Sequence, residues 1–568
     1  MSAHPTSFPT GRPGPGAPGA GARGALARLY RRDLAGYPPT ARRWSCLAIV
    51  VLTTVVLYYM LYVQYAVATS IITHFGMTYR SFVWVSVVGN AVGAFASLLA
   101  GLADRWGRAN MVVYGLLAAS ALVCFGLPNA GGATAYLVLF ALVSFVEGVV
   151  LVATPALIRD FSPQLGRATA MGYWTMGPVV GSLVVTMVTS HTLDGSSWQD
   201  ELRYSAIAGF AVFAVALVAL RELAPAVRDQ VMVSLRDRAL VEARARGVEP
   251  TASRRGEWRR VLRADVVGSA LAVALFLLLY YAAVGNFVVY FSTTFGYDEQ
   301  RANALANWYW AANAIALVAV GVLSDRLRVR KPFMVVGALG SIAFTAVFAS
   351  RATHPATGYS TFAWLFVGIG VFSGIAYGPW MAGFTETVER RDPAATAAGL
   401  AVWGWTVRVV VAVSTAFIPV LVTSVTPLVE HGAQVAAASR TAAPALAIVE
   451  QHPRLFAELD RYPAGKAPAA LTAQAVAQVG PDDLAVVARA RPQLAVLDAY
   501  GAKVREASAD GPGQWRDWWW ICVGGQVLFL PFVWAMAGRW RPKRAREDAE
   551  AHERAVAEEL AALAAARE

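Results

Sequence analysis

Apolar residues in this chain fall into long runs that are separated by short polar turns. About twelve of the runs reach the roughly 20 residues that a helix needs to cross a bilayer. Because hydrocarbon offers no water to backbone amides and carbonyls, each run is expected to be a helix. Their approximate bounds are 45–72, 81–102, 109–128, 133–157, 168–190, 203–221, 264–292, 302–323, 332–350, 359–381, 396–422 and 518–538. The pattern predicts an all-α membrane protein with about 12 transmembrane helices.

Polar segments divide these runs into two six-helix halves. An arginine-rich segment, expected to be a linker, separates the sixth run from the seventh, and a long mixed segment separates the last two. The first run starts near Ser45 and is too long for the core of a signal peptide. We expect these regions in order: a disordered basic cytoplasmic tail (1–44), an N-terminal six-helix half (45–221), a cytoplasmic linker (222–263), helices 7–11 (264–422), an extracytoplasmic segment of short helices (423–515), helix 12 (516–541) and a helical cytoplasmic tail (542–568).

Composition and charge agree with a membrane protein and give it an orientation. Only 15% of residues are charged and 57% are hydrophobic, whereas soluble domains carry about a quarter charged residues. The net charge is +12, but the arginines cluster in alternate loops, so both termini are expected in the cytoplasm. Nucleic-acid binding is not expected, because the linker offers only Trp258 for base stacking. The three cysteines show no metal or disulfide spacing.

A charged turn that occurs once in each half is the most informative motif. The stretch Gly101 to Arg108, with the sequence G-L-A-D-R-W-G-R, lies between the second and third runs. A degraded copy starts at Gly321, and its Asp325 follows Asp104 by 221 residues. A second pair of similar stretches, after the fourth and tenth runs, has glycines 227 residues apart. Two matches in nearly one register indicate an internal repeat.

With these features the chain resembles the major facilitator superfamily of secondary transporters. The resemblance covers nearly everything from residue 45 to 538 and includes the six-plus-six arrangement and the basic linker. The family's loop signature G-x-L-x-D-R-x-G-R is matched by Leu102, Asp104, Arg105, Gly107 and Arg108, and Gly101 stands one position after the signature's first glycine. The second copy keeps Gly321, Asp325 and Arg326 and lacks the later glycine. The resemblance implies the fold of this superfamily, in a bacterial member with an enlarged outer loop between spans 11 and 12.

The repeated turn is expected to act as a conformational switch. Asp104 ends the second helix, where the helix dipole disfavours a negative charge, so this carboxylate needs another partner. The resemblance implies that this partner is the start of helix 11, near Ala395 and Thr396, and that Asp325 faces the start of helix 5, near Ala168 and Thr169. Such contacts between halves would exist only with the cytoplasmic side closed. The alternative is that Asp104 and its arginines only terminate a span and set the topology.

Two ionisable residues lie deep within predicted spans, where a charge costs about 2.5–3.5 kcal/mol. Glu147 is near the middle of the fourth span and Arg408 is similarly placed in the eleventh. Glu147 is the candidate proton-coupling residue, and Arg408 is a candidate donor to an anionic substrate, because its guanidinium is always charged. The alternative is a structural or gating ion pair between the two halves.

Further candidates line the central cavity that the resemblance implies between helices 1, 4, 7 and 10. The substrate-binding candidates on these helices are Gln64, Tyr65, Tyr281, Asn286, Tyr377 and Trp380. Each of them can instead serve in packing or as an interfacial anchor, since Trp and Tyr gather at span ends. Glu386, at the cytoplasmic end of helix 10, is interpreted as a gate charge.

No sequence motif for a chemical reaction competes with transport. The chain has no Walker sequence, no His-Glu-x-x-His helix and no Gly-x-Ser-x-Gly elbow. We therefore expect no enzyme activity, no cofactor and no metal. The predicted function is proton-coupled symport of a small organic solute by a monomer in the inner membrane. Efflux driven by protons is the first alternative, and a sensor that binds a ligand through segment 423–515 without transport is the second.

Overall fold

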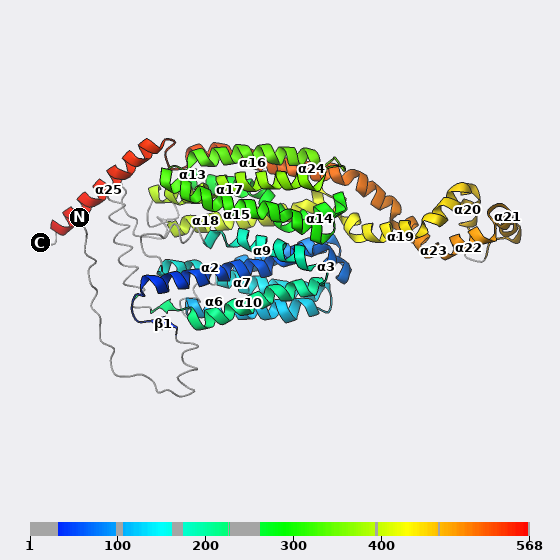
Figure 1. The fold of residues 1–568 in the computed structure, drawn as a ribbon, viewed down its shortest axis with the longest axis horizontal. Coiled ribbons are helices and arrows are strands. Elements are labelled where there is room, and N and C mark those ends of the chain that lie inside the picture. Colours follow the sequence, from blue (N-terminus) through cyan, green and yellow to red (C-terminus); the bar gives the residue numbers. More distant parts are fainter. Residues whose placement is uncertain are drawn as a thin grey trace, which may run out of the picture.

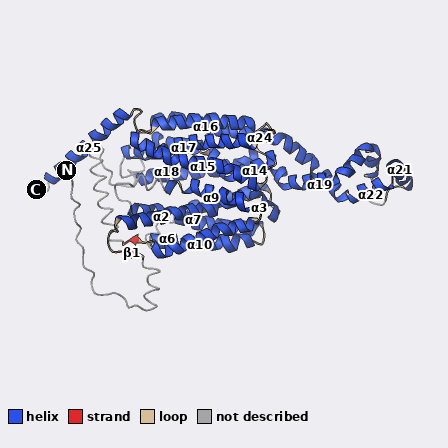
Figure 2. Ribbon diagram, in the orientation of Figure 1, coloured by secondary structure: helices blue, strands red, loops and turns tan. Residues whose placement is uncertain are grey.

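The computed structural model describes residues 32–97, 106–161, 174–224, 227, 262–391, 396–463 and 466–565. These residues form helices almost throughout, apart from one pair of two-residue strands (Figure 2). The helices of the N-terminal half gather on one side of the bundle and those of the C-terminal half on the other (Figure 1). We call the end that carries the strands and α25 (Pro542–Ala565) the inner end and the opposite end the outer end.

The N-terminal half follows the predicted order of spans. Its first span is broken at Val67, because α2 ends there and α3 begins directly after it. A π-turn (Leu122–Gly126) and a 3₁₀ turn (Leu127–Asn129) extend the third span. The helices of this half are α2 (Thr40–Ala66), α3 (Ala68–Phe75), α4 (Tyr79–Ser97), α6 (Arg108–Ala121), α7 (Ala133–Phe161), α9 (Gly177–Thr192) and α10 (Trp198–Ala219).

The C-terminal half repeats this plan and adds a second broken span. Leu277 separates the two parts of the seventh span. Rings of Phe287, Tyr290, Phe348 and Trp519 fill the space between its helices near the outer end. The helices of this half are α13 (Ala264–Phe276), α14 (Leu278–Phe295), α15 (Glu299–Leu327), α16 (Lys331–Arg351), α17 (Tyr359–Arg391), α18 (Thr396–Leu421) and α24 (Ala502–Ala535).

The prediction of an all-α membrane fold is confirmed. Ten helices within the described residues are long and apolar enough to cross a membrane. The second and fifth predicted spans correspond to α4 and α9, which border the undescribed residues 98–105 and 162–173. The short connections between spans fix which helices are neighbours. The chain is a multi-pass membrane protein.

A helical extension projects from the outer end (Figure 1). It starts with α19 (Val425–Gln451), which also packs against α3 and α4 of the other half. The short helices α20 (Pro453–Leu459), α21 (Ala469–Val479), α22 (Pro481–Arg489) and α23 (Arg491–Val496), with a π-turn at Leu497–Gly501, complete it. The chain then returns along α24, which begins at Ala502, before the predicted start of helix 12 at residue 516. Hydropathy could not locate the true start, because the first turns of α24 carry Lys503, Glu506 and Asp510.

Of the predicted disordered tail (1–44), residues 1–31 lie outside the described chain, and the rest contains a short strand and the start of a helix. Helix α2 already begins at Thr40. Strand β1 (Asp33–Leu34) pairs in parallel with β2 (Glu222–Leu223), which opens the segment predicted as a linker. Two backbone hydrogen bonds join them, from Glu222 to Arg32 and from Ala224 to Leu34. The two inner segments are therefore tied to each other.

Candidate functional site

The inner turn of the N-terminal half is held by an ion pair. Of the predicted switch residues, Gly101, Asp104 and Arg105 lie outside the described residues, and Gly107 and Arg108 lie within them. Arg108 begins α6 and donates to both carboxylate oxygens of Asp160, at 2.8 and 3.0 Å. Asp160 is buried near the end of α7. The pair fastens the start of the third span to the end of the fourth.

Glu222 is a second partner of this turn and was not predicted from the sequence. Its Oε2 accepts a hydrogen bond of 2.8 Å from the backbone N–H of Arg108. This carboxylate therefore caps the N-terminus of α6, where free N–H groups and the helix dipole favour a negative charge. Burial raises the pKa of Glu222, the hydrogen bond from Arg108 opposes that rise, and the charge of Asp33 adds to it. The only sequence signal was an acidic residue at the start of a basic segment.

Arg32 fixes the strand that supports Glu222. Its side chain is 1% exposed, and its Nη1 donates to the carbonyl of Leu217 at 2.7 Å and, at 3.4 Å, to Ala216 and Leu220. Its Nε donates to Asn110 Oδ1 at 3.0 Å. A guanidinium at the C-terminus of a helix satisfies carbonyls that have no partner within that helix. Arg32 thus joins the tail to α10 and α6.

The C-terminal half has an equivalent arrangement, which is formed by Arg330 of the second copy. Arg330 lies 2.6 Å from Asp325 and 3.1 Å from Glu386, whereas Arg326 is exposed. Arg330 follows Arg108 by 222 residues and Glu386 follows Asp160 by 226, so the two ion pairs match the internal repeat. Gly321 lies one turn before Asp325 on α15 with open space at its Cα.

The predicted switch contacts between the halves lie outside the described residues. The start of helix 5 near Ala168 and Thr169 falls in the undescribed range 162–173, and Ala395 falls in 392–395. These contacts stay predictions. Each described half has its own charge pair at the inner end, which gives the turn a fixed shape within that half.

Charged and aromatic side chains meet at mid-height of the bundle. Glu147 of α7 and Arg408 of α18 come from opposite halves and lie within electrostatic range of each other. Tyr58 of α2 lies within range of both, and Tyr281 of α14 and Tyr377 of α17 lie within range of Arg408 or Tyr58. Three of the predicted residues, Tyr281, Tyr377 and Arg408, are therefore gathered around Tyr58, which also lies within range of Glu147.

Close helix packing places Glu147 in this group. The space beside Gly93 of α4 is occupied by the backbone of Ser144 and by Glu147 Oε2, which would lie 3.9 Å from an added Cβ. Gly148 is even closer to α4, since its Cβ would come within 2.4 Å of the Gly93 carbonyl. Two glycines in contact let the helices approach each other. The carboxylate is consequently 8% exposed between two helices of its own half.

The remaining predicted residues are distributed around this group. Tyr65 packs edge-on against Phe82 and next to Tyr62. Gln64 is buried, and its Oε1 accepts a hydrogen bond of 3.2 Å from Tyr136 within the N-terminal half. Gln64 therefore connects helices 1 and 4 of that half.

Trp380 lies behind Tyr377 in the packed core. Its ring is fully buried and stacks at 6.2 Å with Tyr377. Its N–H donates to Ser269 Oγ of α13 at 3.1 Å. The Trp380 ring has no exposed surface, and its one hydrogen-bond donor already has a partner. It therefore supports Tyr377 and does not face the space between the halves.

The two halves are joined by hydrogen bonds at the outer end. Asn286, predicted as a substrate ligand, accepts a bond of 2.6 Å from Tyr79 of α4. Asn303 donates to the carbonyl of Ala66 at 2.8 Å. Gln300 and Asn307 donate to the carbonyl and hydroxyl oxygens of Ser190, at 3.2 and 3.0 Å.

Glu299 makes the densest of these contacts. It begins α15, and its carboxylate accepts hydrogen bonds from the Thr69 hydroxyl, from Ser70 N at 2.9 Å and from Ser70 Oγ at 2.6 Å. Its contacts could not be predicted from the sequence, because an acidic residue at a helix start is common. The space just below, between Tyr62, Ser182 and Trp310, has a volume of about 20 Å³, which is room for one water molecule. The outer end is closed in this structure.

Two helical halves that meet around a mid-bundle carboxylate and arginine, with one end closed, define a membrane transporter. The family model of the Major Facilitator Superfamily matches residues 47–438, which is more than half of the chain. The chain therefore belongs to the Major Facilitator Superfamily, whose members are transporters and not enzymes. Within the described residues no group of three or more His, Cys, Asp or Glu side chains is placed to hold a metal ion.

Solved structures show the same fold. An inward-facing, unoccupied bacterial homologue of the human lysosomal transporter Spinster is 15% identical with a TM-score of 0.55, over 87% of this chain and 99% of that one. A D-xylose-proton symporter is 13% identical with a TM-score of 0.52, over 66% and 90%. The xylose transporter XylE from E. coli, in a partially occluded inward-open conformation, is 13% identical with a TM-score of 0.51, over 66% and 92%. No curated protein sequence matches the chain.

Proposed function

We propose that the protein moves a small organic solute across the cytoplasmic membrane by proton-coupled symport, as a monomer with both termini in the cytoplasm. The observation that supports this most is the meeting of Glu147 and Arg408 from opposite halves at mid-height of the bundle. An ionisable side chain at membrane depth is costly and marks an ion or substrate path by default. Transport by alternating access would move these two groups relative to each other.

The pair offers a simple coupling of proton and solute. While Glu147 is ionised, the positive charge of Arg408 attracts it. When a proton neutralises Glu147, the attraction that holds the guanidinium to it is lost. The positive charge of Arg408 then binds an anionic group of the solute more strongly, because a guanidinium stays charged at any physiological pH. Proton and anion would therefore bind together and be released together, which is symport.

Neighbouring tyrosines would complete the solute site. Tyr58, Tyr281 and Tyr377 come from helices 1, 7 and 10 and lie around the charged pair. Their hydroxyls can donate and accept, and their rings give apolar surface. Tyr281 follows the break at Leu277, and interrupted helices are common at the substrate sites of transporters. A protein of the same fold is named as a D-xylose-proton symporter, which is consistent with this assignment.

The proposal is tested in two steps, of which the first identifies a ligand and the second measures its transport. Thermal shift of the purified protein against a panel of small organic anions and sugars identifies a ligand, since specific binding raises the melting temperature. Uptake of that ligand into proteoliposomes is then measured with and without an inward proton gradient. We expect accumulation only with the gradient. The Glu147→Gln variant should lose accumulation and keep ligand exchange at equal pH.

The matched control is Asp194→Asn, which neutralises an exposed carboxylate at the outer end. Accumulation should be unchanged in this variant. Gradient-driven accumulation by Glu147→Gln at the normal rate would contradict the coupling role. Extrusion driven by an inward proton gradient would instead favour efflux, and ligand binding without any flux would favour a sensor.

A further inference from the structure

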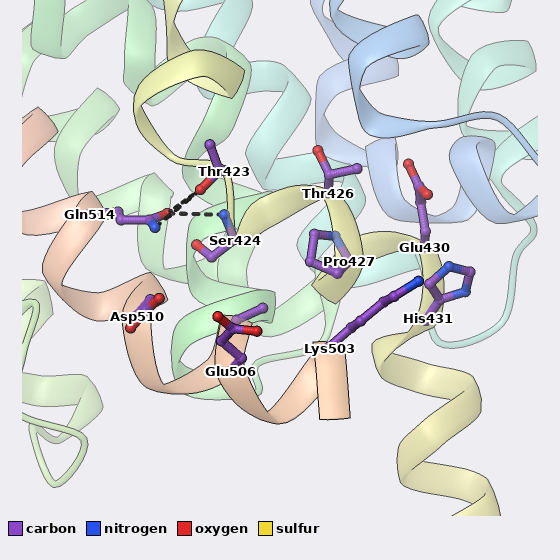
Figure 3. A pocket seen from close by; sticks show the side chains of 11 residues that line it. Thr423, Ser424, Thr426, Pro427, Glu430, His431, Lys503, Glu506, Asp510 and Gln514 are labelled. Carbon is purple, nitrogen blue, oxygen red and sulfur yellow. Dashed lines mark hydrogen bonds between the residues drawn. The ribbon is translucent and has the colours of Figure 1, made fainter. Parts of the chain in front are cut away.

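A hollow of about 410 Å³ lies at the base of the outer extension, between the start of α19 and the first turns of α24. Its lining comes from residues 423–431 on one side and 503–514 on the other (Figure 3). The volume falls within the range of small-molecule sites. It is distinct from the Glu147 region, because these residues lie in the extension and not at mid-height of the bundle (Figure 1).

Contacts at both ends hold the hollow at a fixed width. At the membrane side, Gln514 Oε1 accepts from Ser424 N at 2.9 Å, and its Nε2 donates to Thr423 Oγ1 at 3.1 Å. At the far side, the rings of His431 and Tyr500 stack with centroids 3.9 Å apart. Helix α24 below Gln514 is anchored by Trp515, which is fully buried. A site whose walls are fixed beforehand loses less entropy when it binds a ligand.

Carboxylates dominate the lining. Glu430, Glu506 and Asp510 contribute three negative charges, and Lys503 contributes one positive charge. Glu506 and Asp510 are four residues apart and share one face of α24, while Lys503 extends toward His431 (Figure 3). Within the described residues, none of the three carboxylates forms a hydrogen bond or an ion pair. The hollow therefore favours a cation.

Two buried oxygens of the lining lack hydrogen-bond partners. Ser424 is 3% exposed and its hydroxyl has no partner in the described structure, nor has Glu430 Oε1. The Ser424 hydroxyl faces α24, since a Cβ on Gly511 would lie 3.2 Å from it. A buried polar atom without a partner costs about 1–3 kcal/mol. A ligand in the hollow that donates hydrogen bonds would satisfy the Ser424 hydroxyl.

We propose that this hollow binds a small organic cation with primary amino groups. Three carboxylates and the unpartnered Ser424 hydroxyl accept hydrogen bonds, and an ammonium group offers three donors. A metal ion does not fit, because no group of three or more suitable side chains converges among the described residues. The site faces the outer end and would bind its ligand independently of the central pair.

Calorimetry on the full chain in lipid nanodiscs tests the proposal with putrescine as the probe. Putrescine should bind, and glutarate, an anion of similar length, should not. The double variant Glu506→Gln/Asp510→Asn should weaken putrescine binding at least tenfold. Lys503→Gln should strengthen it, because it removes a competing ammonium group. Glu147→Gln should leave the affinity unchanged, which separates this site from the central one.

Unchanged melting temperatures would show that the variants fold, as expected for side chains on an exposed helix face. The proposal is overturned if putrescine fails to bind at millimolar concentration, if glutarate binds in preference, or if the double variant binds like the wild type. Since Lys503→Gln is expected to act in the opposite direction, a general loss of fold cannot imitate the predicted pattern.

Discussion

A left-handed backbone angle occurs at the inner turn of each half. Gly107 has φ +87° and Arg328, which follows it by 221 residues, has φ +54°. Arg328 is the C-cap of α15, and its N–H donates to the carbonyl of Asp325. Sequence alone showed that the second copy had lost its glycine. It did not show that a positive φ recurs at this position, because the αL conformation of Arg328 is imposed by the end of α15.

Replacement of Arg328 by glycine should relieve this conformation. An L-residue with a Cβ pays about 1–2 kcal/mol in the left-handed region, and glycine does not. Arg328→Gly should therefore be more stable than Arg328→Ala by about 1–2 kcal/mol, while both lose the same charge. Unfolding of the two purified variants, followed by tryptophan fluorescence, gives the difference. Equal stabilities would contradict an αL requirement at this turn.

At the scale of elements, hydropathy predicted the number and order of spans well, because membrane helices need long apolar runs. Hydropathy did not locate the ends of elements whose bounds depend on polar side chains. Strand β1 exists because Arg32 is fixed against α10 and α6, and α24 starts early because its charged turns lie outside the membrane. In the site, charges at membrane depth were visible in the sequence. The contacts that Arg330 makes with Glu386, Glu222 with Arg108 and Glu299 with Ser70 were not, because each joins segments that are far apart in the chain.

The stability of the folded protein is expected to depend on pH through Glu222 of strand β2. Burial raises its pKa in the folded protein above the value in the unfolded chain, so the folded state binds the proton more tightly. Its stabilising contribution is complete below the unfolded pKa and is lost as pH rises through the folded pKa. One proton limits the slope to about 1.4 kcal/mol per pH unit. Stability should fall with rising pH across this window.

Glu222→Gln removes this titration and keeps an oxygen to accept from the Arg108 N–H. The stability of the variant relative to the wild type should therefore rise with pH across the window. Melting temperatures of both proteins between pH 4 and pH 8 measure this. A difference that stays constant with pH would show that Glu222 does not titrate with folding.

At the scale of the whole molecule, the hydrogen bonds between the halves described above lie at the outer end. Transport requires that this end open, so these bonds must break in each cycle. Glu299 accepts three of them from Thr69 and Ser70. Hydrogen bonds to a charged group contribute about 1.5–3 kcal/mol each. Loss of one of these hydrogen bonds should therefore shift the conformational equilibrium markedly from a closed toward an open outer end.

Glu299→Gln should open the outer end more often, because the amide nitrogen cannot accept and at least one of the three bonds is lost. A cysteine at position 306, whose alanine lines the small space below the closure, reports the opening. In a background without Cys46, Cys124 and Cys522, its reaction with a membrane-impermeant maleimide should accelerate about tenfold or more.

Asp298→Asn is the control for this measurement, because Asp298 only caps its own helix through Arg301 N. It should leave the labelling rate unchanged. Equal rates in the wild type and in Glu299→Gln would mean that the other contacts alone keep the outer end closed.

The pairing of β1 with β2 provides a fixed position for one of two dyes in an energy-transfer measurement. Ala35 follows β1 and is exposed, yet its strand is fastened to the N-terminal half through Arg32. Arg541 is also exposed, next to Trp540, which lies under Lys331 at the start of α16. Dyes at these two positions would travel with opposite halves and touch no span. Energy transfer between them would then follow the rocking of a single molecule in real time, with every residue of the transport path left native.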